Sequence, residues 1–300
     1  MSFIDDRLET LIAVCDAKSF TKAADNLGLT QPAVSQHIKR LEDELQTSLF
    51  LRKKGEMVLS AEGEIAVLYA KRLRAMESKM LSKIKNAQSN VRKIRIGITH
   101  TQESSVMIEV LSKLTGKEDN LNITFITDNI KNLYDMLENF EIDMAIIEGK
   151  PTNPDFNFVV LDADPLLCVM SPQNPLSSGA AITLAQLKSQ QLILRLPSSS
   201  TREKFESSLL SIGESIVSFN VTIEVDSIAT IRSLVKKNFG VSILSKKVCI
   251  KDVNKHSLVA LPIENLSMIR ETTIAYHKTY THPEIVSRIA QVYNALVLPQ

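Results

Sequence analysis

The chain has 300 residues, of which 44% are hydrophobic and 23% are charged, a composition typical of globular proteins with two or three cores. Its 35 basic and 34 acidic residues give a formal net charge of +1, which excludes a polycation. Any binding of nucleic acid therefore depends on a local basic patch.

The cysteines and the uncharged stretches bear on the cellular compartment. Cys15, Cys168 and Cys249 are far apart and odd in number, which argues against a secreted disulfide framework. Acidic and basic residues within 5–9 argue against a signal peptide. The longest uncharged run, 165–187, contains prolines and many polar residues, so it does not fit a membrane span. We expect a soluble, cytoplasmic protein that does not bind membranes.

The usual catalytic and metal-binding motifs are missing from the sequence. The closest glycines, Gly55 and Gly63, are too far apart for a P-loop, a GxGxxG fingerprint or a GxSxG elbow. His277 and His282 lack the HExxH spacing, and no CxxC pair occurs. We expect no enzymatic activity, no metal and no cofactor.

The first forty-five positions predict three helices. Apolar residues at helical spacing favour a helix over 5–17, and a short helix over 21–27 precedes Gly28, which suits a tight turn. Thr30 is a fair N-cap for a third helix that ends at Leu45. Helix, glycine turn and helix in this order are typical of a helix-turn-helix.

The third helix has two different faces. Its apolar stripe, which we expect to face inward, consists of Val34, Ile38, Leu41 and Leu45. Its polar residues fall elsewhere, and they are Gln31, Ser35, Gln36, Lys39 and Arg40. Glutamine pairs with adenine and serine bonds to base edges, whereas lysine and arginine bind phosphates. The helix therefore suits insertion into the major groove of double-stranded DNA.

Residues 48–59 predict a β-wing of two short strands around a turn. The wing carries three consecutive cations, Arg52, Lys53 and Lys54, which suit phosphate contacts. By itself, such a charge run is more often a solvated loop.

These segments together resemble the N-terminal domain of LysR-type transcription regulators. The similarity runs through Phe20–Leu27, Leu29–Ile38, Leu41–Leu45, Leu49–Arg52 and Leu59–Gly63. The resemblance implies that Arg52 contacts the DNA backbone. It also implies that five residues of the third helix face the DNA, namely Gln31, Pro32, Ser35, Gln36 and Lys39.

Three positions of this N-terminal segment depart from the family pattern. Gln36 and His37 stand where the family often has an arginine and a polar residue, which leaves the operator preference open. His37 could act as a pH sensor, but an ordinary polar contact is the simpler interpretation. Ser60 replaces the usual threonine and keeps an N-cap hydroxyl.

Ser60 is expected to cap a long helix that ends near Ala87. Its apolar stripe consists of Ile65, Tyr69, Leu73, Met76, Met80, Ile84 and Ala87. In the resembling family, such a linker helix pairs antiparallel in a homodimer, and the family is commonly tetrameric. The alternative is packing within one chain. Residues 86–91 are a plausible hinge.

The remaining residues predict two α/β lobes. Strands over 93–98, 121–126 and 142–147 alternate with helices over 106–114 and 130–139, which implies a parallel sheet. Further strands are expected over 166–170, 191–194, 221–225, 241–244 and 270–277. Further helices are expected over 184–188, 201–211, 228–237 and 283–296.

The overall expectation is a mixed fold with three parts. They are a winged helix-turn-helix domain (1–60), a linker helix with hinge (61–90), and an effector domain (91–300). The effector domain resembles a periplasmic binding protein, with lobe I formed by 91–162 and 267–300 and lobe II by 163–266. Crossings near 161–165 and 262–268 would place a ligand cleft between the lobes. Asn238 and Phe239 depart from the family pattern at the turn before Gly240.

Two polar segments are candidates for the effector site. Residues 99–104 and 197–201 each follow a strand and open a helix, where hydroxyls and free N–H groups suit an anion such as a carboxylate. The candidates are Thr99, His100, Thr101, Gln102, Ser198, Ser199 and Thr201. Simple N-capping is the alternative for both segments, and His100 is equally consistent with a structural hydrogen bond.

These expectations favour a DNA-binding transcription regulator controlled by a small effector. One rival is an enzyme or solute-binding protein, which would need catalytic groups or an export signal. Another is a constitutive DNA-binding or architectural protein with an unused cleft. A redox switch through Cys168 and Cys249 is disfavoured, because Cys168 lies in an apolar strand.

Overall fold

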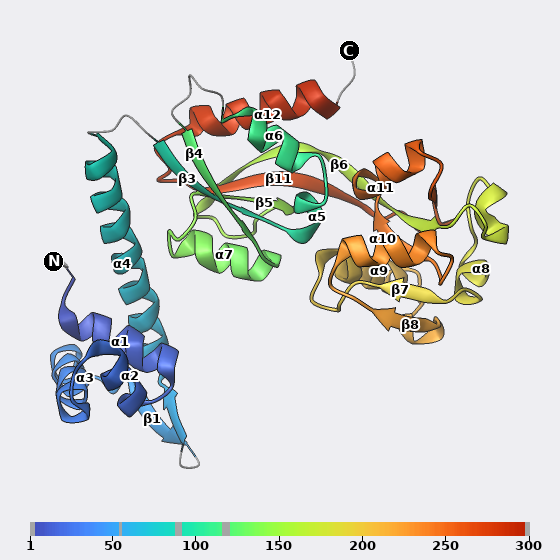
Figure 1. Cartoon of the computed structure of the whole chain (residues 1–300). Coiled ribbons are helices and arrows are strands. Elements are labelled where there is room, and N and C mark those ends of the chain that lie inside the picture. The colour runs from blue at the N-terminus through green and yellow to red at the C-terminus, as the bar shows by residue number, and fades with distance from the viewer. Residues whose placement is uncertain (1–3, 54–55, 88–91, 116–120, 298–300) are drawn as a thin grey trace. The chain divides into compact units, whose positions relative to one another are not determined.

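The computed structural model describes residues 4–53, 56–87, 92–115 and 121–297. The chain divides into two compact units (Figure 1). Unit 1 comprises Met1–Val91 with Glu138–Glu141, and unit 2 comprises Arg92–Leu137 and Ile142–Gln300.

Unit 1 begins with the three expected helices, which are α1 (Asp6–Ala17), α2 (Phe20–Leu27) and α3 (Gln31–Leu45). Each follows a residue whose side-chain oxygen accepts a hydrogen bond from a first-turn N–H, namely Asp5, Ser19 and Thr30. Gly28 ends α2 with a φ of 65°, in the left-handed region that favours glycine. The local signals in the sequence therefore set these boundaries.

The apolar stripe of α3 is buried except at its end. Val34, Ile38 and Leu41 are 0%, 3% and 6% exposed, as expected. The expectation for Leu45 was wrong, since its side chain is 50% exposed. Leu45 lies in the last turn, and Gln46 then adopts a left-handed conformation that turns the chain toward the wing.

The wing consists of β1 (Phe50–Lys53) and β2 (Glu56–Leu59), which pair antiparallel. The two expected strands are therefore confirmed. Residues 54–55 at the turn, including Lys54, lie outside the described residues, as do the side chains of Arg52 and Lys53.

Helix α4 (Ala61–Ala87) follows the wing directly. Ser60 Oγ accepts a hydrogen bond from Gly63 N at 2.8 Å and donates one to the carbonyl of Ser48 at 2.6 Å. A Cβ on Gly63 would lie 2.1 Å from the carbonyl oxygen of Leu49, so only glycine lets α4 begin this close to the wing. The expected cap is confirmed.

One face of α4 packs on the helices of unit 1 and another does not. Val67 joins the core of α1–α3. The predicted apolar stripe is 44–59% exposed over Ile65, Tyr69, Leu73, Met76, Met80 and Ile84. The side chain of Ala87 and the hinge residues 88–91 lie outside the part of the chain that the structure describes.

Unit 2 is an α/β structure (Figure 1). Its strands are β3 (Arg92–Ile98), β4 (Leu121–Thr127), β5 (Met144–Glu148), β6 (Phe156–Met170), β7 (Leu192–Leu194), β8 (Val221–Glu224), β9 (Ser242–Ser245), β10 (Val259–Leu261) and β11 (Ile269–His277). Its helices are α5 (His100–Glu103), α6 (Met107–Lys113), α7 (Ile130–Glu138), α8 (Leu184–Lys188), α9 (Ser200–Leu210), α10 (Ile228–Lys236), α11 (Lys246–Asn254) and α12 (Pro283–Val297), with short 3-10 turns at Pro175–Ser178 and Ile216–Ser218.

The main sheet has the strand order β10-β6-β11-β5-β3-β4, and β9 also pairs with β6. Strand β3 is parallel to β4 and β5, as expected, whereas β11 runs antiparallel to β5 and β6. We call the part around β3–β5, α5–α7 and α12 lobe I, and the part around β7–β10 and α8–α11 lobe II.

Strands β6 and β11 connect the two lobes without a break (Figure 1). Strand β6 pairs with β11 up to Pro165 and with β9 and β10 from Leu166 onward. The register of β6 and β11 shifts between Thr272 and Thr273, where Leu161 is left without a partner. The expected strand start at Leu166 was therefore wrong, because β6 begins at Phe156.

Helix α11 was not predicted from the sequence. Its N-cap, Ser245, makes no capping hydrogen bond to the helix, because its Oγ donates to Asp164 at 2.6 Å. The serine hydroxyl that would normally cap the start of the helix is therefore bonded to Asp164 instead.

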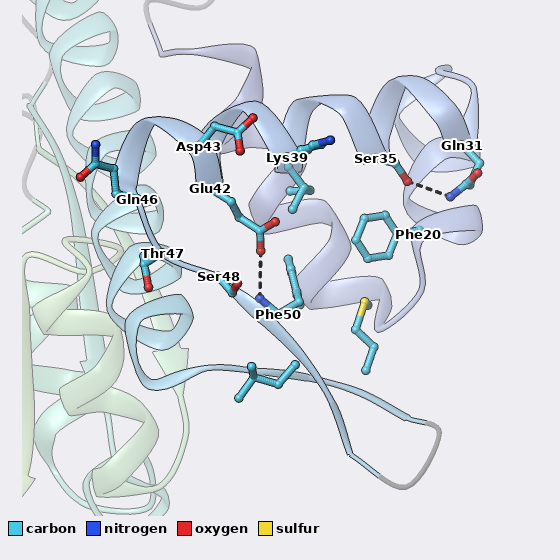
Figure 2. Close-up of a pocket in the computed structure, with 13 residues that line it drawn as sticks. Phe20, Gln31, Ser35, Lys39, Glu42, Asp43, Gln46, Thr47, Ser48 and Phe50 are labelled. Atoms are coloured by element: carbon cyan, nitrogen blue, oxygen red, sulfur yellow. Dashed lines mark hydrogen bonds between the residues drawn. The ribbon is translucent and has the colours of Figure 1, made fainter.

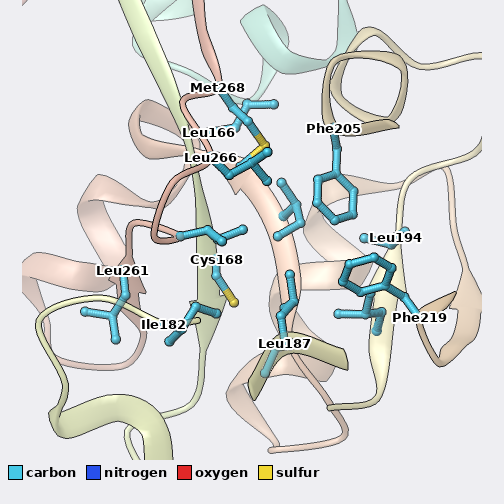
Figure 3. Packing of buried hydrophobic residues seen from close by; sticks show 14 of the residues in the cluster. Leu166, Cys168, Ile182, Leu187, Leu194, Phe205, Phe219, Leu261, Leu266 and Met268 are labelled. Atoms are coloured by element: carbon cyan, nitrogen blue, oxygen red, sulfur yellow. The ribbon is translucent and has the colours of Figure 1, made fainter. Parts of the chain in front are cut away.

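Each lobe has its own buried core. In lobe II, side chains from β6, β7, α9 and the segment before β11 pack together around Leu166, Phe205 and Met268 (Figure 3). Cys168 lies within this cluster and is fully buried. In lobe I, Ile96, Met107 and Ile289 join β3, α6 and α12.

Candidate functional site

The outer face of α3 carries the predicted DNA contacts. Val34 and Ile38 anchor the helix, whereas Gln36, Lys39 and Arg40 are exposed and Ser35 is half-buried. This arrangement fits a helix that presents polar groups outward while its aliphatic side holds it in place.

An open concavity of about 960 Å³ lies between α3 and the wing (Figure 2). Gln31, Ser35 and Lys39 line it from α3, and Gln31 Nε2 donates to Ser35 Oγ at 2.8 Å. Phe50 and Met57 line it from the wing strands. The structure thus brings these three α3 residues together on one surface.

The remaining predicted α3 residues lie off this concavity. Pro32, Gln36 and Arg40 are exposed but do not line it. They occupy successive turns on the neighbouring side of the helix, which suits contacts along a second edge of the groove.

Glu42 holds the wing against α3, a role that the sequence did not reveal. Its Oε1 accepts a hydrogen bond from Leu49 N at 2.7 Å. It also accepts one from Phe50 N at 3.3 Å (Figure 2). The carboxylate therefore fixes the start of β1. Asp43, next to it, is exposed and lines the same concavity.

His37 makes a structural contact with α1. Its Nδ1 lies 2.9 Å from Thr10 Oγ1, and the Thr10 hydroxyl donates to the carbonyl of Asp6 at 2.8 Å. Because that hydroxyl has only one proton, His37 Nδ1 must be the donor. This contact favours the simpler interpretation of His37.

In unit 2, a cleft of about 170 Å³ lies between the lobes. Of the predicted effector residues, those that line it are Thr99, His100, Thr101, Ser198 and Ser199. Gln102 and Thr201 are 1% and 3% exposed and do not line the cleft. The two predicted segments therefore do meet at one site.

Several side chains at the cleft already have hydrogen-bond partners. Thr99 Oγ1 and Gln102 Nε2 donate to Glu148 Oε1 at 2.7 and 2.9 Å. Ser200 Oγ donates to Glu148 Oε2 at 2.8 Å. Glu148, at the end of β5, is 7% exposed and thus connects lobe I to the start of α9. No local pattern in the sequence marks this residue.

Capping accounts for part of the polar segments. Thr99 Oγ1 accepts from Gln102 N, and Ser199 Oγ accepts from Arg202 N, each at 3.3 Å. The N-capping alternative thus applies to these two hydroxyls. Ser198, Thr101 and His100 line the cleft without such a capping role.

Charged residues that were not predicted from the sequence also line the cleft. Arg195 is 3% exposed, and its Nη2 donates to Asp226 at 2.9 Å. Asp128 and Asn129 line the cleft from lobe I. Arg195, Asp128 and Asp226 lie just after strands β7, β4 and β8, and that position at strand ends is the signal that could have identified them.

A buried charge pair lies where the strands cross between lobes. Asp164 is fully buried, 3.7 Å from Arg270 Nη2, and Arg270 Nη1 donates to Ser200 and Thr201 at 3.1 and 3.3 Å. Burial raises the pKa of Asp164, although Arg270 and the hydroxyl of Ser245 act in the opposite direction.

The cysteines of lobe II are poorly suited to thiol chemistry. Burial raises the pKa of Cys168 and of Cys249 to about 12. Within the described ranges, no group of His, Cys, Asp and Glu is arranged to hold a metal ion. No described helix has the length and apolarity needed to cross a membrane.

Two family models match the chain. The LysR substrate binding domain matches residues 87–295, and the bacterial regulatory helix-turn-helix protein of the lysR family matches residues 6–64.

Known proteins are similar over most of the chain. The regulator CysL of Bacillus subtilis is 28% identical and aligns with 89% of this chain and 88% of its own length. The RuBisCO operon transcriptional regulator of Allochromatium vinosum is 25% identical and aligns with 91% of this chain and 89% of its own length. The crystal structure of CbnR has a TM-score of 0.66 at 16% identity and covers 98% of this chain and 99% of its own. A full-length OxyR variant of Pseudomonas aeruginosa has a TM-score of 0.64 at 20% identity over 98% and 96%.

The structural likenesses show the fold, and the family models show the family. Both the expected resemblance and the expected mixed fold are confirmed. The chain belongs to the LysR family of DNA-binding transcription regulators, which carry a substrate-binding domain and are not enzymes.

Proposed function

We propose that this chain is a sequence-specific regulator that binds double-stranded DNA through α3 and the wing and responds to a small anionic effector in the interlobe cleft. The proposed domains are residues 1–60, 61–90 and 91–300, with the cleft between the two lobes of the last. The output is a change in lobe closure that alters the arrangement of the oligomer on DNA.

The observation that carries the DNA-binding part is the division of α3 into two faces. Buried Val34 and Ile38 hold the helix, while polar groups remain available on its other side. The proposed DNA contacts are Gln31, Pro32, Ser35, Gln36, Lys39, Arg40, Arg52, Lys53 and Lys54. Among the structural neighbours is full-length CbnR in complex with its target DNA.

The cleft supports the effector part of the proposal. Its lining contains hydroxyls, and the helices α7 and α9 begin at it, so that their free N–H groups favour a negatively charged group. The proposed contacts are Thr99, His100, Thr101, Ser198 and Ser199, with Gln102 and Thr201 supporting them from behind.

The exposed stripe of α4 supports a homodimer. Its side chains from Ile65 to Ile84 form an apolar row along the helix. Such a row is stable only when another surface covers it, and a second α4 in antiparallel orientation presents the same row. Two such dimers would give the proposed homotetramer.

A binding-site selection from random duplexes tests the DNA part. The full chain is expected to enrich a specific sequence, and Gln31→Ala is expected to weaken that complex by about 1–3 kcal/mol. Gln291→Ala, at an exposed position of α12, is the matched control and should leave the affinity unchanged. No enriched sequence, or equal effects of both variants, would contradict the proposal.

A further inference from the structure

The cleft between the lobes contains a cation that its protein partners do not fully satisfy. Arg195 lines the cleft and is 3% exposed. Its Nη2 bonds to Asp226, but its Nε has no hydrogen-bond partner among the described residues. A buried guanidinium with unused donor capacity is stabilised by a planar carboxylate, which accepts two parallel N–H bonds.

The same cleft also contains acidic groups, which a simple anion would repel. Asp128 in lobe I and Asp226 in lobe II both line it. Asp226 is 56% exposed in its side chain and bonds through Oδ1, whereas its Oδ2 is 3.9 Å from His100 Nε2. Asp128 uses Oδ1 to accept from Asn129 N and Asn132 Nδ2 at 2.7 and 2.8 Å. Each aspartate thus keeps one oxygen for a donor in the cleft.

The charges of the cleft therefore call for a ligand with both signs. One guanidinium and two carboxylates line the cleft. Behind Ser200, the opposite charges of Glu148 and Arg270 offset each other, because both groups are hydrogen-bonded to the Ser200 hydroxyl. The starts of α7 and α9 supply about half a positive charge each, which leaves the lining close to neutral or negative. An anion alone would leave the aspartates uncompensated, while an added ammonium group would pair with them.

The volume of the cleft suits a small metabolite. The cleft measures about 170 Å³. On the scale of ~30 Å³ for one water molecule, this is room for a ligand with few non-hydrogen atoms, such as a short amino acid.

We infer that the effector is a small amino-carboxylate zwitterion, whose carboxylate is bound by Arg195 and whose protonated amine is bound by Asp226 and Asp128. This inference rests on the proposed function, because it concerns the same effector cleft, but it replaces the anionic effector with a ligand that carries one carboxylate and one ammonium group. On binding, the ligand carboxylate replaces Asp226 at the guanidinium, and Asp226 turns to the ammonium group. The Arg195–Asp226 ion pair is thereby replaced by one ion pair between Arg195 and the ligand carboxylate and one between Asp226 and the ligand ammonium group. Asp128 adds a contact to the ammonium group from lobe I.

Calorimetric titration of the full chain with matched compounds tests the inference. The probes are the twenty protein amino acids and short ω-amino acids, each beside its des-amino acid and its decarboxylated amine, together with sulfate and phosphate. At least one amino acid is expected to bind 10-fold or more tightly than both of its analogues.

Variants assign the two charges separately. Asp226→Asn is expected to weaken the binding of the zwitterion at least 10-fold. The affinity for the des-amino acid should stay unchanged or increase. Arg195→Lys keeps the positive charge but loses the planar guanidinium, so it should weaken the binding of both compounds. Glu264→Gln, at an exposed position of lobe II outside the cleft lining, is the matched control and should leave the binding of both compounds unchanged.

The alternative results are distinguishable. Equal binding of an amino acid and its des-amino acid, or binding of sulfate or phosphate alone, would overturn this inference and leave an anionic effector in place. Binding of none of the probes would overturn the inference and also count against the effector part of the proposed function, while the DNA-binding part would still stand on its own test.

Discussion

Ser200 Oγ donates a hydrogen bond to Glu148 Oε2 at 2.8 Å and so ties the first residue of α9 to the last residue of β5. The two residues belong to different lobes, and the other oxygen of Glu148 is bonded to Thr99 and Gln102 within lobe I. One carboxylate therefore joins the two walls of the cleft.

Removing this link is expected to loosen the lobes. Ser200→Ala leaves an oxygen of Glu148 without its donor, which should lower the free energy of unfolding by about 1–3 kcal/mol. Ser207→Ala is the control on the same helix, because its exposed hydroxyl donates only to the carbonyl of Lys204. Urea denaturation checks the prediction, and equal midpoints for the two variants would contradict it.

The wing should depend on Glu42. Glu42→Ala removes the acceptor for Leu49 N and Phe50 N, so that both amides exchange their hydrogens faster and DNA binding weakens. Asp43→Ala, at the next position, removes an exposed carboxylate that accepts neither of these two amides and should leave this exchange unchanged. Hydrogen exchange by NMR measures both. Unchanged protection of Leu49 and Phe50 in Glu42→Ala would count against the role of Glu42.

The buried carboxyl of Asp164 should produce a specific dependence of stability on pH. Its pKa in the folded chain is raised above the ordinary value of 3.8, so the folded state holds this proton more tightly than the unfolded state. Stability from this group is therefore present at low pH and is lost as pH rises from about 4 through the folded pKa.

Comparison with Asp164→Asn isolates this effect. The free energy of unfolding of the wild type, minus that of the variant, is expected to fall as pH rises through that interval. Other titrating groups cancel in this difference. Chemical denaturation at several pH values measures it, and a difference that stays constant or rises would rule out a raised pKa.

The α4 stripe should control the oligomeric state. Leu73→Asp places a charge in the apolar row and is expected to convert a dimer into a species near the 33.4 kDa mass of one chain. Ser78→Asp, an exposed position off the stripe, is the matched control. Light scattering after size exclusion gives the masses. A wild type that is already monomeric would contradict the dimer, as would identical masses for both variants.

Local signals were sufficient to predict unit 1 from the sequence. Thr30 and Ser60 cap α3 and α4 as expected, and Val34 and Ile38 follow the helical period. Leu45 follows the same period but ends exposed, because burial also requires a neighbouring element at that turn.

In the cleft of unit 2, the hydroxyl residues could be predicted from the sequence, but the charged residues could not. Residues such as Thr99 and Ser199 were recognisable because they cap helices after strands. Glu148, Arg195 and Asp226 act through partners far away in the sequence, and their pairing depends on how the lobes fold together. Likewise, β6 could not be identified as one strand, because its two halves pair with different partners.

The unbroken course of β6 and β11 determines how the lobes can move. The two strands are hydrogen-bonded to each other as far as the boundary, where Leu166 N also donates to Met268 O at 2.9 Å, so the lobes are not joined by flexible single segments. Relative motion must instead come from twisting this two-stranded ribbon, and the unpaired Leu161 provides the point of least resistance. The response to a ligand should accordingly be a small, elastic rotation that returns to its starting angle when the ligand leaves.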